Sequence, residues 1–479
     1  MEYHEQSLSL DSLIHIFSFL PEDDLIRVSC VCKDWHEAAE TQWLWREMCL
    51  HRWGFCNMAQ LLSDAESYTW KRYYLHRSTL ELNMKSGRSG GDYSCKSLRG
   101  HTGRIVGFAY LTGNSSLQDM WNFTPIVCSA SNDGMLKAWD IHKGLNLWSS
   151  STQNPLTQII TDPEQDVVIT ADSGGTIRTW RGRTGDALSS FSSGSSQCTI
   201  MTFSTEGKSF VMVTRTALGS LLTLTSPQLC ELSRHLVSDS FRLNLLLSSP
   251  DKKWILTSAK EYADSSPKVF STQSVCSPVE DEAGVCESVC VSLPVSGCVA
   301  AAFFPLQPAR VAVVHNDTLL QHNTLSVFQF SLKKSKYKQE AQAQQIESFR
   351  LDLNARRSDV LLQAKGNNVL LLADGNVLKV YSVKGELISS FEEHLEPITS
   401  MCVDDFRVVT ASRDLSLRVL TWRRDRDKGL TLETQYQLLG GSHSMSRGFT
   451  AVACDYASIV GSVEAVNGKD VLKAYVFNS

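Results

Sequence analysis

The stretch that decides the fold is Val127-Cys-Ser-Ala-Ser-Asn-Asp-Gly-Met-Leu-Lys-Ala-Trp-Asp140, which consists of two short β-rich runs joined by a turn. The turn centres on Asn132, Asp133 and Gly134, residue types that favour tight connections between strands. Neither run is long enough for a helix, and neither shows helical spacing of apolar residues. The stretch therefore predicts a pair of antiparallel strands.

The same two-run unit recurs eight times before the C-terminus. Divided among eight units, residues 98–479 supply about 48 residues each, slightly more than the ~40–45 of a four-stranded propeller blade. The excess lies in three insertions: 114–123 lengthens the first unit, 281–290 lies between the fourth and fifth units, and 333–345 lies between the fifth and sixth. An eight-bladed propeller is favoured, and seven blades remain an alternative if two units merge. The first runs are Pro125–Ala130, Val167–Thr170, Phe210–Thr214, Trp254–Thr257, Val311–Val314, Val369–Leu372, Arg407–Thr410 and Ser458–Ser462.

The first unit resembles a WD repeat. A Gly-His pair ending at His101 precedes it, an S-x-S-x-D-G turn follows the first run, and a Trp-Asp pair closes the second. The resemblance implies a hydrogen-bonded relay of His101, Ser129, Asp133 and Trp139, which satisfies polar groups that would be costly to bury alone. Two other units keep part of the frame, namely Thr170, Gly174 and Trp180 in the second and His394, Thr410, Asp414 and Leu420 in the seventh.

A propeller must close its ring, because otherwise the first and last blades expose strand edges. We expect Ser94–Leu98, just ahead of the Gly-His pair, to supply the outer strand of the last blade. That strand would join the two ends of the domain.

The first 80 or so residues have a different, helical pattern. Leu10, Leu13, Phe17 and Leu20 recur at three- and four-residue spacing, and the helix is expected to end before Pro21. Shorter helical patterns follow, and so small a core is often completed by a partner. We assign 5–50 to an all-α module, 51–84 to a helical linker, 85–93 to a flexible linker and 94–479 to the propeller.

The segment Leu8–Trp45, LSLDSLIHIFSFLPEDDLIRVSCVCKDWHEAAETQWLW, resembles an F-box. Ser9 stands where that family usually has proline, and we expect this change to loosen the N-terminal anchor. An F-box, a helical linker and WD repeats follow one another in the F-box/WD-repeat family, and the resemblance covers nearly the whole chain. The matching positions are Leu8, Leu13, Ile16, Phe17, Leu20, Pro21, Asp24, Leu25, Val28, Val31, Cys32, Trp35, Leu44 and Trp45.

The resemblance implies a substrate-recognition subunit of an SCF-type E3 ubiquitin ligase. The F-box would bind a Skp-type adaptor, and through it the cullin and RING subunits, while the propeller would bind a protein substrate. Such a subunit acts by proximity and is not itself an enzyme. The alternative is a WD-repeat interaction scaffold outside any ligase. The expected adaptor-binding residues are Leu8, Ile16, Phe17, Pro21, Leu25, Val28 and Val31.

The expected substrate face is formed by the loops between blades and the turns that carry the relay aspartates. By position, Arg104, Asn132 and Arg413 belong to this face. Several arginines together would suit a phosphorylated substrate, because guanidinium groups bind phosphate through two hydrogen bonds. Ordinary solvated arginines are the alternative.

Composition excludes several other classes. Charged residues make up 20% of the chain and the net charge is -5, which gives no reason to expect a nucleic-acid or membrane partner. There is no secretory signal and no run of about 18 apolar residues, so we expect a soluble protein of the cytoplasm or nucleus. The 14 cysteines form no C-x-x-C pair, and no P-loop, G-x-S-x-G or H-E-x-x-H motif occurs. Neither a metal, a cofactor nor a catalytic residue is expected.

Overall fold

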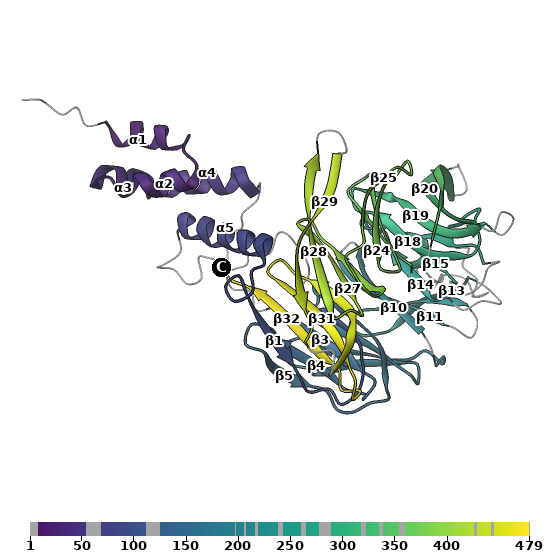
Figure 1. Cartoon of the computed structure of the whole chain (residues 1–479). Coiled ribbons are helices and arrows are strands. Elements are labelled where there is room, and N and C mark those ends of the chain that lie inside the picture. The colour runs from purple at the N-terminus through teal and green to yellow at the C-terminus, as the bar shows by residue number, and fades with distance from the viewer. Residues whose placement is uncertain are drawn as a thin grey trace, which may run out of the picture. The chain divides into compact units, whose positions relative to one another are not determined.

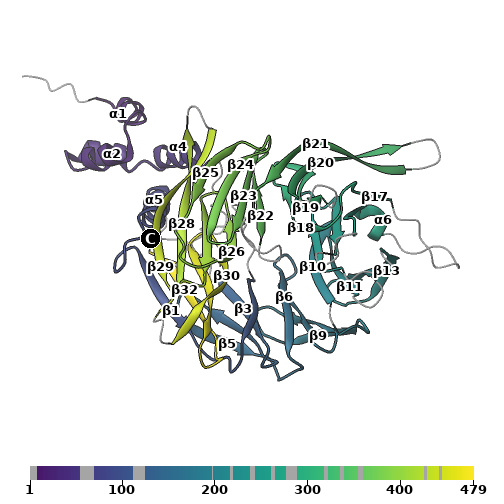
Figure 2. The same ribbon diagram turned by 45° about the vertical axis from the view of Figure 1, so that its right-hand side comes forward.

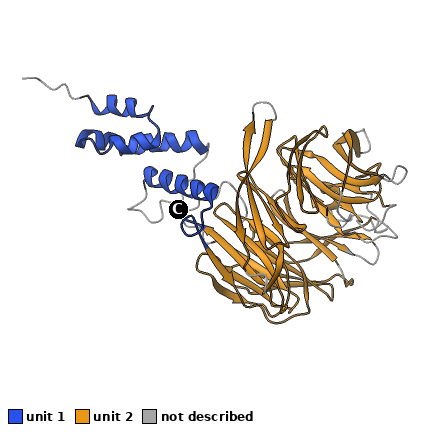
Figure 3. Cartoon of the chain, in the orientation of Figure 1, with its two compact units in different colours: residues 1–94, 114–124, 477–479 blue, residues 95–113, 125–476 orange. Residues whose placement is uncertain are grey.

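The computed structural model describes residues 8–53, 69–111, 125–196, 198–205, 207–215, 219–237, 243–259, 265–276, 289–317, 322–334, 339–353, 360–425, 429–441 and 445–478. The chain forms two compact units, coloured separately in Figure 3. The first consists of residues 1–94 with 114–124 and 477–479, and is called the helical unit below. The second consists of residues 95–113 and 125–476, and is called the propeller unit.

The helical unit contains five described helices. They are α1 (Leu10–Phe17), α2 (Glu22–Val28), α3 (Lys33–Ala39), α4 (Gln42–Trp53) and α5 (Trp70–Ser86). Their apolar faces share one core, to which α5 adds two tyrosines. The buried members of this core are Leu13, Phe17, Leu25, Ala38, Ala39, Leu44, Trp45, Cys49, Tyr73 and Tyr74.

Local sequence explains where the first two helices begin. Ser9 caps α1, since its side chain accepts a hydrogen bond from the backbone N–H of Ser12 at 3.3 Å. Pro21 precedes α2, and three acidic residues follow it at the positive end of the helix dipole. The serine that departs from the F-box pattern thus has a structural role of its own as a helix cap.

A polar network fastens α5 to the preceding helices. The Arg52 guanidinium donates to the Tyr74 hydroxyl at 3.1 Å and to Ser78 Oγ at 3.0 Å, and Trp53 Nε1 donates to Glu81 Oε1 at 2.6 Å. Burial and a hydrogen bond to Glu22 raise the pKa of Tyr74 to about 12. Because α5 completes the core, the segment expected to be a linker over 51–84 contributes to the folded module.

The expected flexible linker at 85–93 is largely structured. Residues 85 and 86 still belong to α5, which ends at Gly87 in the left-handed conformation. The carboxylate of Asp92 then closes a short turn by accepting from the Arg88 backbone N–H at 2.7 Å and contacting Ser86. Tyr93 already begins the next strand.

The propeller unit consists of four-stranded antiparallel sheets, one for each blade. Blade one contains β2 (Ile105–Tyr110), β3 (Ile126–Ser131), β4 (Leu136–Asp140) and β5 (Leu145–Ser149). Blade two contains β6 (Leu156–Asp162), β7 (Val167–Asp172), β8 (Thr176–Arg181) and β9 (Ala187–Ser192). Blade three contains β10 (Cys198–Thr205), β11 (Lys208–Arg215), β12 (Ser220–Thr225) and β13 (Glu231–Leu236). Blade four contains β14 (Leu245–Ser248), β15 (Trp254–Ser258), β16 (Lys268–Ser271) and β17 (Cys290–Ser292), with a short helix α6 (Thr272–Cys276) after β16.

The second half of the unit repeats this order. Blade five contains β18 (Cys298–Phe304), β19 (Gln307–Asp317), β20 (His322–Lys334) and β21 (Gln339–Leu351). Blade six contains β22 (Leu361–Lys365), β23 (Val369–Asp374), β24 (Val377–Ser382) and β25 (Leu387–Phe391). Blade seven contains β26 (Ile398–Val403), β27 (Arg407–Ser412), β28 (Ser416–Asp425) and β29 (Gly429–Leu439). Blade eight contains β30 (Ser446–Cys454), β31 (Ser458–Ala465), β32 (Val471–Phe477) and β1 (Tyr93–Leu98).

The first strands of the blades close a ring of eight. In the described residues each of β2, β6, β10, β14, β18, β22, β26 and β30 contacts the next, and β30 contacts β2. The last blade has the order β1-β32-β31-β30, so a strand from the start of the unit completes the final sheet (Figure 1). The eight-bladed prediction is confirmed, and this closure covers the edge that β32 would otherwise expose.

The insertion predicted at 333–345 lies within a blade and not between two blades. Residues 333 and 334 end β20, and residues 339–345 belong to β21, its hairpin partner (Figure 2). Polar residues dominate β21, and exposed and partly buried positions roughly alternate along it. Such a strand can extend beyond its blade because it leaves few apolar groups in water. The insertion expected at 114–123 lies outside the described residues, as does most of that at 281–290.

Candidate functional site

The helical unit exposes apolar side chains that a module of this size could be expected to bury. Leu8, Ile16 and Val31 are 55%, 47% and 62% exposed, and Phe19 reaches 78%. Large apolar groups left in water mark surfaces that bind partners. The exposed apolar set, as used below, is Leu8, Leu10, Ile16, Phe19, Ile26, Val31 and Trp43.

The expected adaptor-binding residues divide into two groups. Leu8, Ile16, Pro21 and Val31 are exposed, and Val28 is half-buried. The other two are core residues: Phe17 is 2% exposed and Leu25 is 0% exposed. They lie on the inward faces of α1 and α2 and cannot contact a partner unless the core opens. The assignment of these two to the interface is therefore corrected.

Four members of the exposed apolar set escaped the sequence prediction. Ile26 directly follows the buried Leu25, and Trp43 directly precedes the buried Leu44. Consecutive residues on a helix point about 100° apart, so an apolar neighbour of a core residue is turned toward solvent. That pattern could have identified both residues. The remaining two are Leu10 and Phe19.

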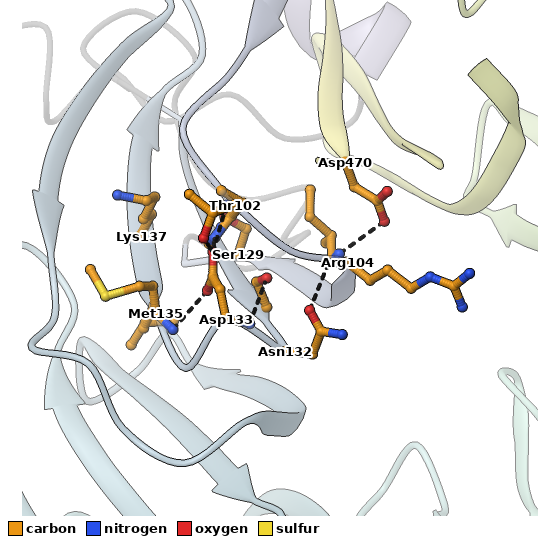
Figure 4. Close-up of polar contacts among 12 residues, drawn as sticks. Thr102, Arg104, Ser129, Asn132, Asp133, Met135, Lys137 and Asp470 are labelled. Carbon is orange, nitrogen blue, oxygen red and sulfur yellow. Dashed lines mark hydrogen bonds and ion pairs between the residues drawn. The ribbon is translucent and has the colours of Figure 1, made fainter. Parts of the chain in front are cut away.

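The four relay side chains of blade one form a continuous chain of contacts. Trp139 Nε1 donates to Ser129 Oγ at 2.9 Å, and that oxygen lies 2.8 Å from His101 Nε2. His101 Nδ1 lies 3.3 Å from Asp133 Oδ2. Asp133 also accepts from the backbone N–H groups of Thr102 at 2.8 Å and Met135 at 2.9 Å, as Figure 4 shows. The relay thereby connects the loop before blade one to two of its strands.

Both titratable members of this relay are shifted by their surroundings. Burial lowers the pKa of His101 although Asp133 opposes the shift, and Nδ1 of the imidazole faces the carboxylate. Burial disfavours the ionised form of Asp133, but the N–H groups of Thr102 and Met135 hold its pKa below the usual value. These shifts fit a structural relay whose donors and acceptors are already hydrogen-bonded to one another.

Blade seven has the same relay without the tryptophan. His394 Nδ1 lies 2.9 Å from Asp414 Oδ2, and Nε2 lies 2.8 Å from Thr410 Oγ1. Leu420 occupies the tryptophan position and is buried. Burial lowers the pKa of His394, as it does for the equivalent histidine of blade one.

Blade two keeps a carboxylate, but at a different residue. Gly174 occupies the expected aspartate position, and Asp172 supplies the carboxylate instead, accepting from the N–H groups of Gly174 and Thr176, each at 2.9 Å. Its other oxygen accepts from Arg178 at 2.9 Å. Trp180 Nε1 still donates to Thr170 Oγ1 at 3.0 Å. The prediction by position missed Asp172 because the carboxylate had moved by two residues along the chain.

Three arginines from blades one, seven and eight meet on one carboxylate of blade eight. Arg104 Nη2 lies 3.1 Å from Glu464 Oε1, and Arg413 Nη1 lies 3.1 Å from Glu464 Oε2. Arg447 Nη1 is 3.6 Å from the first of these oxygens. The three arginine side chains are 60%, 49% and 53% exposed, whereas that of Glu464 is only 9% exposed. This group of three is called the arginine cluster below.

Backbone features hold the cluster in place. Asn132 Oδ1 accepts from the Arg104 backbone N–H at 2.7 Å, and Asp470 Oδ2 accepts from that of Ile105 at 3.0 Å (Figure 4). Gly448 has φ +129° and lies so close to Arg413 that an added Cβ would be 2.3 Å from its Cα. A glycine is therefore needed where β30 passes the turn that carries Arg413.

The structure changes the expected substrate face in two respects. Asn132 is exposed, and its side-chain oxygen accepts from the Arg104 backbone N–H, so it has a supporting role in addition to the expected substrate contact, which stays a prediction. Arg447 joins the cluster although it lies in a strand and not in a loop or relay turn, and no signal in a single repeat singles it out. Glu464 was missed for the same reason.

The comparisons with known proteins follow the same division of the chain. A family model described as F-box-like matches residues 10–51. The chain is 28% identical over 470 residues to human F-box/WD repeat-containing protein 12, and the match covers 98% of both proteins. It is 25% identical over 471 residues to mouse F-box/WD repeat-containing protein 15, with 97% of both covered. Over nearly its whole length the chain is similar to F-box/WD-repeat proteins.

The solved structures that resemble this chain are informative about its fold alone. The crystal structure of the computationally designed Ika8 protein aligns with 80% of the chain and 99% of its own, with a TM-score of 0.54 and 20% identity. In the described residues, no group of three or more His, Cys, Asp or Glu side chains is arranged to hold a metal ion. Nor do those residues include a helix of the length and apolarity that crossing a membrane requires.

Proposed function

We propose that this chain is the substrate-recognition subunit of an SCF-type ubiquitin ligase. The observation that carries the proposal is the exposed apolar set on a helical module that already has its own core. Ile16, which directly precedes the buried Phe17, is 47% exposed, and Val31 is 62% exposed. Several large apolar side chains exposed on one small module indicate a surface that a partner covers. A Skp-type adaptor is the partner that the likeness to F-box proteins supports.

Binding to the adaptor can be tested without disturbing the core. The full chain carrying Ile16→Asp and Val31→Asp is expected to lose co-purification with a Skp-type adaptor and a cullin. Leu306→Asp is the matched control, since Leu306 is 74% exposed but belongs to the propeller unit. Undiminished recovery of the adaptor with the double variant would contradict the proposal. Leu25→Asp is unsuitable because it would place a charge in the core.

For the propeller unit, we propose that the arginine cluster binds a phosphorylated segment of the substrate. Three guanidinium groups converge on a single carboxylate, so one negative charge faces three positive charges. A phosphate with nearly two negative charges and three oxygens would match the remaining donors better than a single carboxylate does. The substrate would then be held for ubiquitin transfer by proximity, without any covalent chemistry by this chain.

Peptide binding distinguishes this role from ordinary solvated arginines. A phosphopeptide array probed with the full chain is expected to give ligands that lose at least about tenfold in affinity on Arg413→Glu or Arg447→Glu. Arg234→Glu is the control, because Arg234 is also about half exposed but pairs with Glu231 on blade three. Equal binding by all three variants would remove the phosphate proposal. A chain that retains ligands but binds no adaptor would instead be a scaffold outside the ligase.

A further inference from the structure

Two cysteines from neighbouring blades meet between blades seven and eight. Cys402 lies on β26 and Cys454 is the last residue of β30. The Cys402 sulfur is hydrogen-bonded to the Cys454 thiol and also accepts from the Cys454 backbone N–H. Both residues are free thiols. The two thiols therefore lie close together on neighbouring strands.

The alignment of the two strands explains this contact. The Val452 backbone N–H donates to Ser400 Oγ at 3.2 Å, which places these two residues opposite each other. β26 and β30 are the first strands of adjacent blades and contact one another. Side chains two residues apart on a strand share a face, so one further step along both strands brings Cys402 opposite Cys454.

The environment makes the two thiols unequal. Cys402 is partly exposed, whereas Cys454 is 6% exposed. The hydrogen bond from Cys454 lowers the pKa of Cys402, and the nearby Arg407 guanidinium acts in the same direction against Asp404. Burial raises the pKa of Cys454. A partly exposed thiol with a lowered pKa beside a buried second thiol is the arrangement of reversible oxidation sites.

We propose that Cys402 and Cys454 form an oxidation site at which hydrogen peroxide joins blades seven and eight through a disulfide. The Cys402 thiolate attacks one peroxide oxygen, the O–O bond breaks, and a sulfenic acid and hydroxide result. Cys454 then loses its proton and attacks the Cys402 sulfur, which releases the second hydroxide. In total, two thiols are oxidised and one peroxide is reduced to two waters.

Trypsin separates the two cysteines, which makes the bond directly observable. Cleavage after Lys384 and Arg407 gives a peptide 385–407 with Cys402 as its one cysteine, and cleavage after Arg447 and Lys469 gives 448–469 with Cys454 as its one cysteine. The folded full chain is treated with hydrogen peroxide, blocked with an alkylating reagent and digested. Mass spectrometry is expected to find these two peptides linked, and the link should disappear on reduction.

Conservative variants and other cysteines provide the controls. In Cys454→Ser, Cys402 should stop at the sulfenic acid and be trapped by dimedone, whereas in Cys402→Ser the Cys454 thiol should stay reduced. Cys128 is fully buried and Cys230 is exposed, so neither should appear in a linked peptide with Cys402. The proposal is overturned if Cys402 is oxidised beyond the sulfenic acid without linking in the native chain. Linking that occurs only after denaturation also overturns it.

Discussion

Blades one and two meet the same structural requirement with different residues. Both bury a tryptophan whose indole N–H donates to a hydroxyl on the second strand, Ser129 in one case and Thr170 in the other. Blade one extends this contact through His101 to Asp133, which also binds the preceding loop. Blade two ends at the hydroxyl, and its carboxylate pairs with an arginine on the third strand.

This difference shows which part of the WD frame a blade can lose. The indole–hydroxyl contact satisfies two groups buried inside the blade, whereas the histidine and aspartate tie the blade to the loop before it. An ion pair within the blade connects strands of that blade, but it does not tie the blade to the loop before it. Blade six has an ion pair like that of blade two, because Lys379 Nζ lies 3.0 Å from the buried Asp374. The four predictions below test this contrast, beginning with the largest effect.

Removing the tryptophan that both blades share should destabilise the two blades to a similar extent. Trp139 and Trp180 are 3% and 5% exposed, and each supplies a donor to a buried hydroxyl. Truncation of either to alanine should lower the free energy of unfolding by about 3–5 kcal/mol. Chemical denaturation of the full chain measures the loss. A difference of more than about 2 kcal/mol between the two variants would mean that the tryptophans are not equivalent.

Removing each blade's carboxylate should separate the two arrangements. Asp172→Asn leaves Arg178 without its charged partner inside blade two, and we expect a loss of about 1–3 kcal/mol. Asp133→Asn should cost a similar amount but should also free the loop that contains Thr102. Amide hydrogen exchange of that loop should therefore rise in Asp133→Asn and remain unchanged in Asp172→Asn. Equal exchange in both variants would contradict the distinction.

The two arrangements should also differ in their response to acid. Folding lowers the pKa of His101 and His394, so the unfolded chain binds more protons once the pH falls below about 6.5. Their contribution to stability is complete above that value and is lost on acidification. Replacing both histidines by glutamine should make the decline of the melting temperature between about pH 7.5 and pH 5.5 less steep. An unchanged slope would show that the relay histidines do not titrate there.

The smallest effect should come from Arg178→Lys. Blade six already uses lysine against a buried aspartate, so the charge of the pair is preserved. The variant loses the 2.8 Å hydrogen bond from Arg178 to Gln153, and we expect a loss of about 0.5–1.5 kcal/mol. Thermal unfolding measures it. A loss as large as that of Asp172→Asn would mean that guanidinium geometry and not charge stabilises blade two.

Sequence patterns predicted the features that depend on neighbouring residues. Each of the eight strand pairs has its own alternation and turn, so blade count and strand positions could be assigned unit by unit. The helices of the N-terminal module also follow from local spacing. Their inward and outward faces do not, because Phe17 and Leu25 are buried by a core that includes Tyr73 and Tyr74 from α5. That packing depends on residues 50 positions away.

The arginine cluster lies at the limit of what a sequence can indicate. Arg104 and Arg413 could be predicted because they lie beside relay positions in the sequence. Glu464 and Arg447 join them only because the ring closes and brings blades seven, eight and one together. The proximity of Cys402 and Cys454 arises in the same way, from the alignment of strands on separate blades. Relations between repeats require the three-dimensional ring.

Affinity for the adaptor tests the central claim most directly. Calorimetric titration of the purified full chain with a purified Skp-type adaptor should give one-to-one binding with a dissociation constant of about 1 μM or tighter. Ile16→Asp with Val31→Asp should weaken it at least about 100-fold, or nearly 3 kcal/mol, while Leu306→Asp should leave it unchanged. No measurable binding by the wild-type chain, or equal affinity of the double variant, would contradict the account.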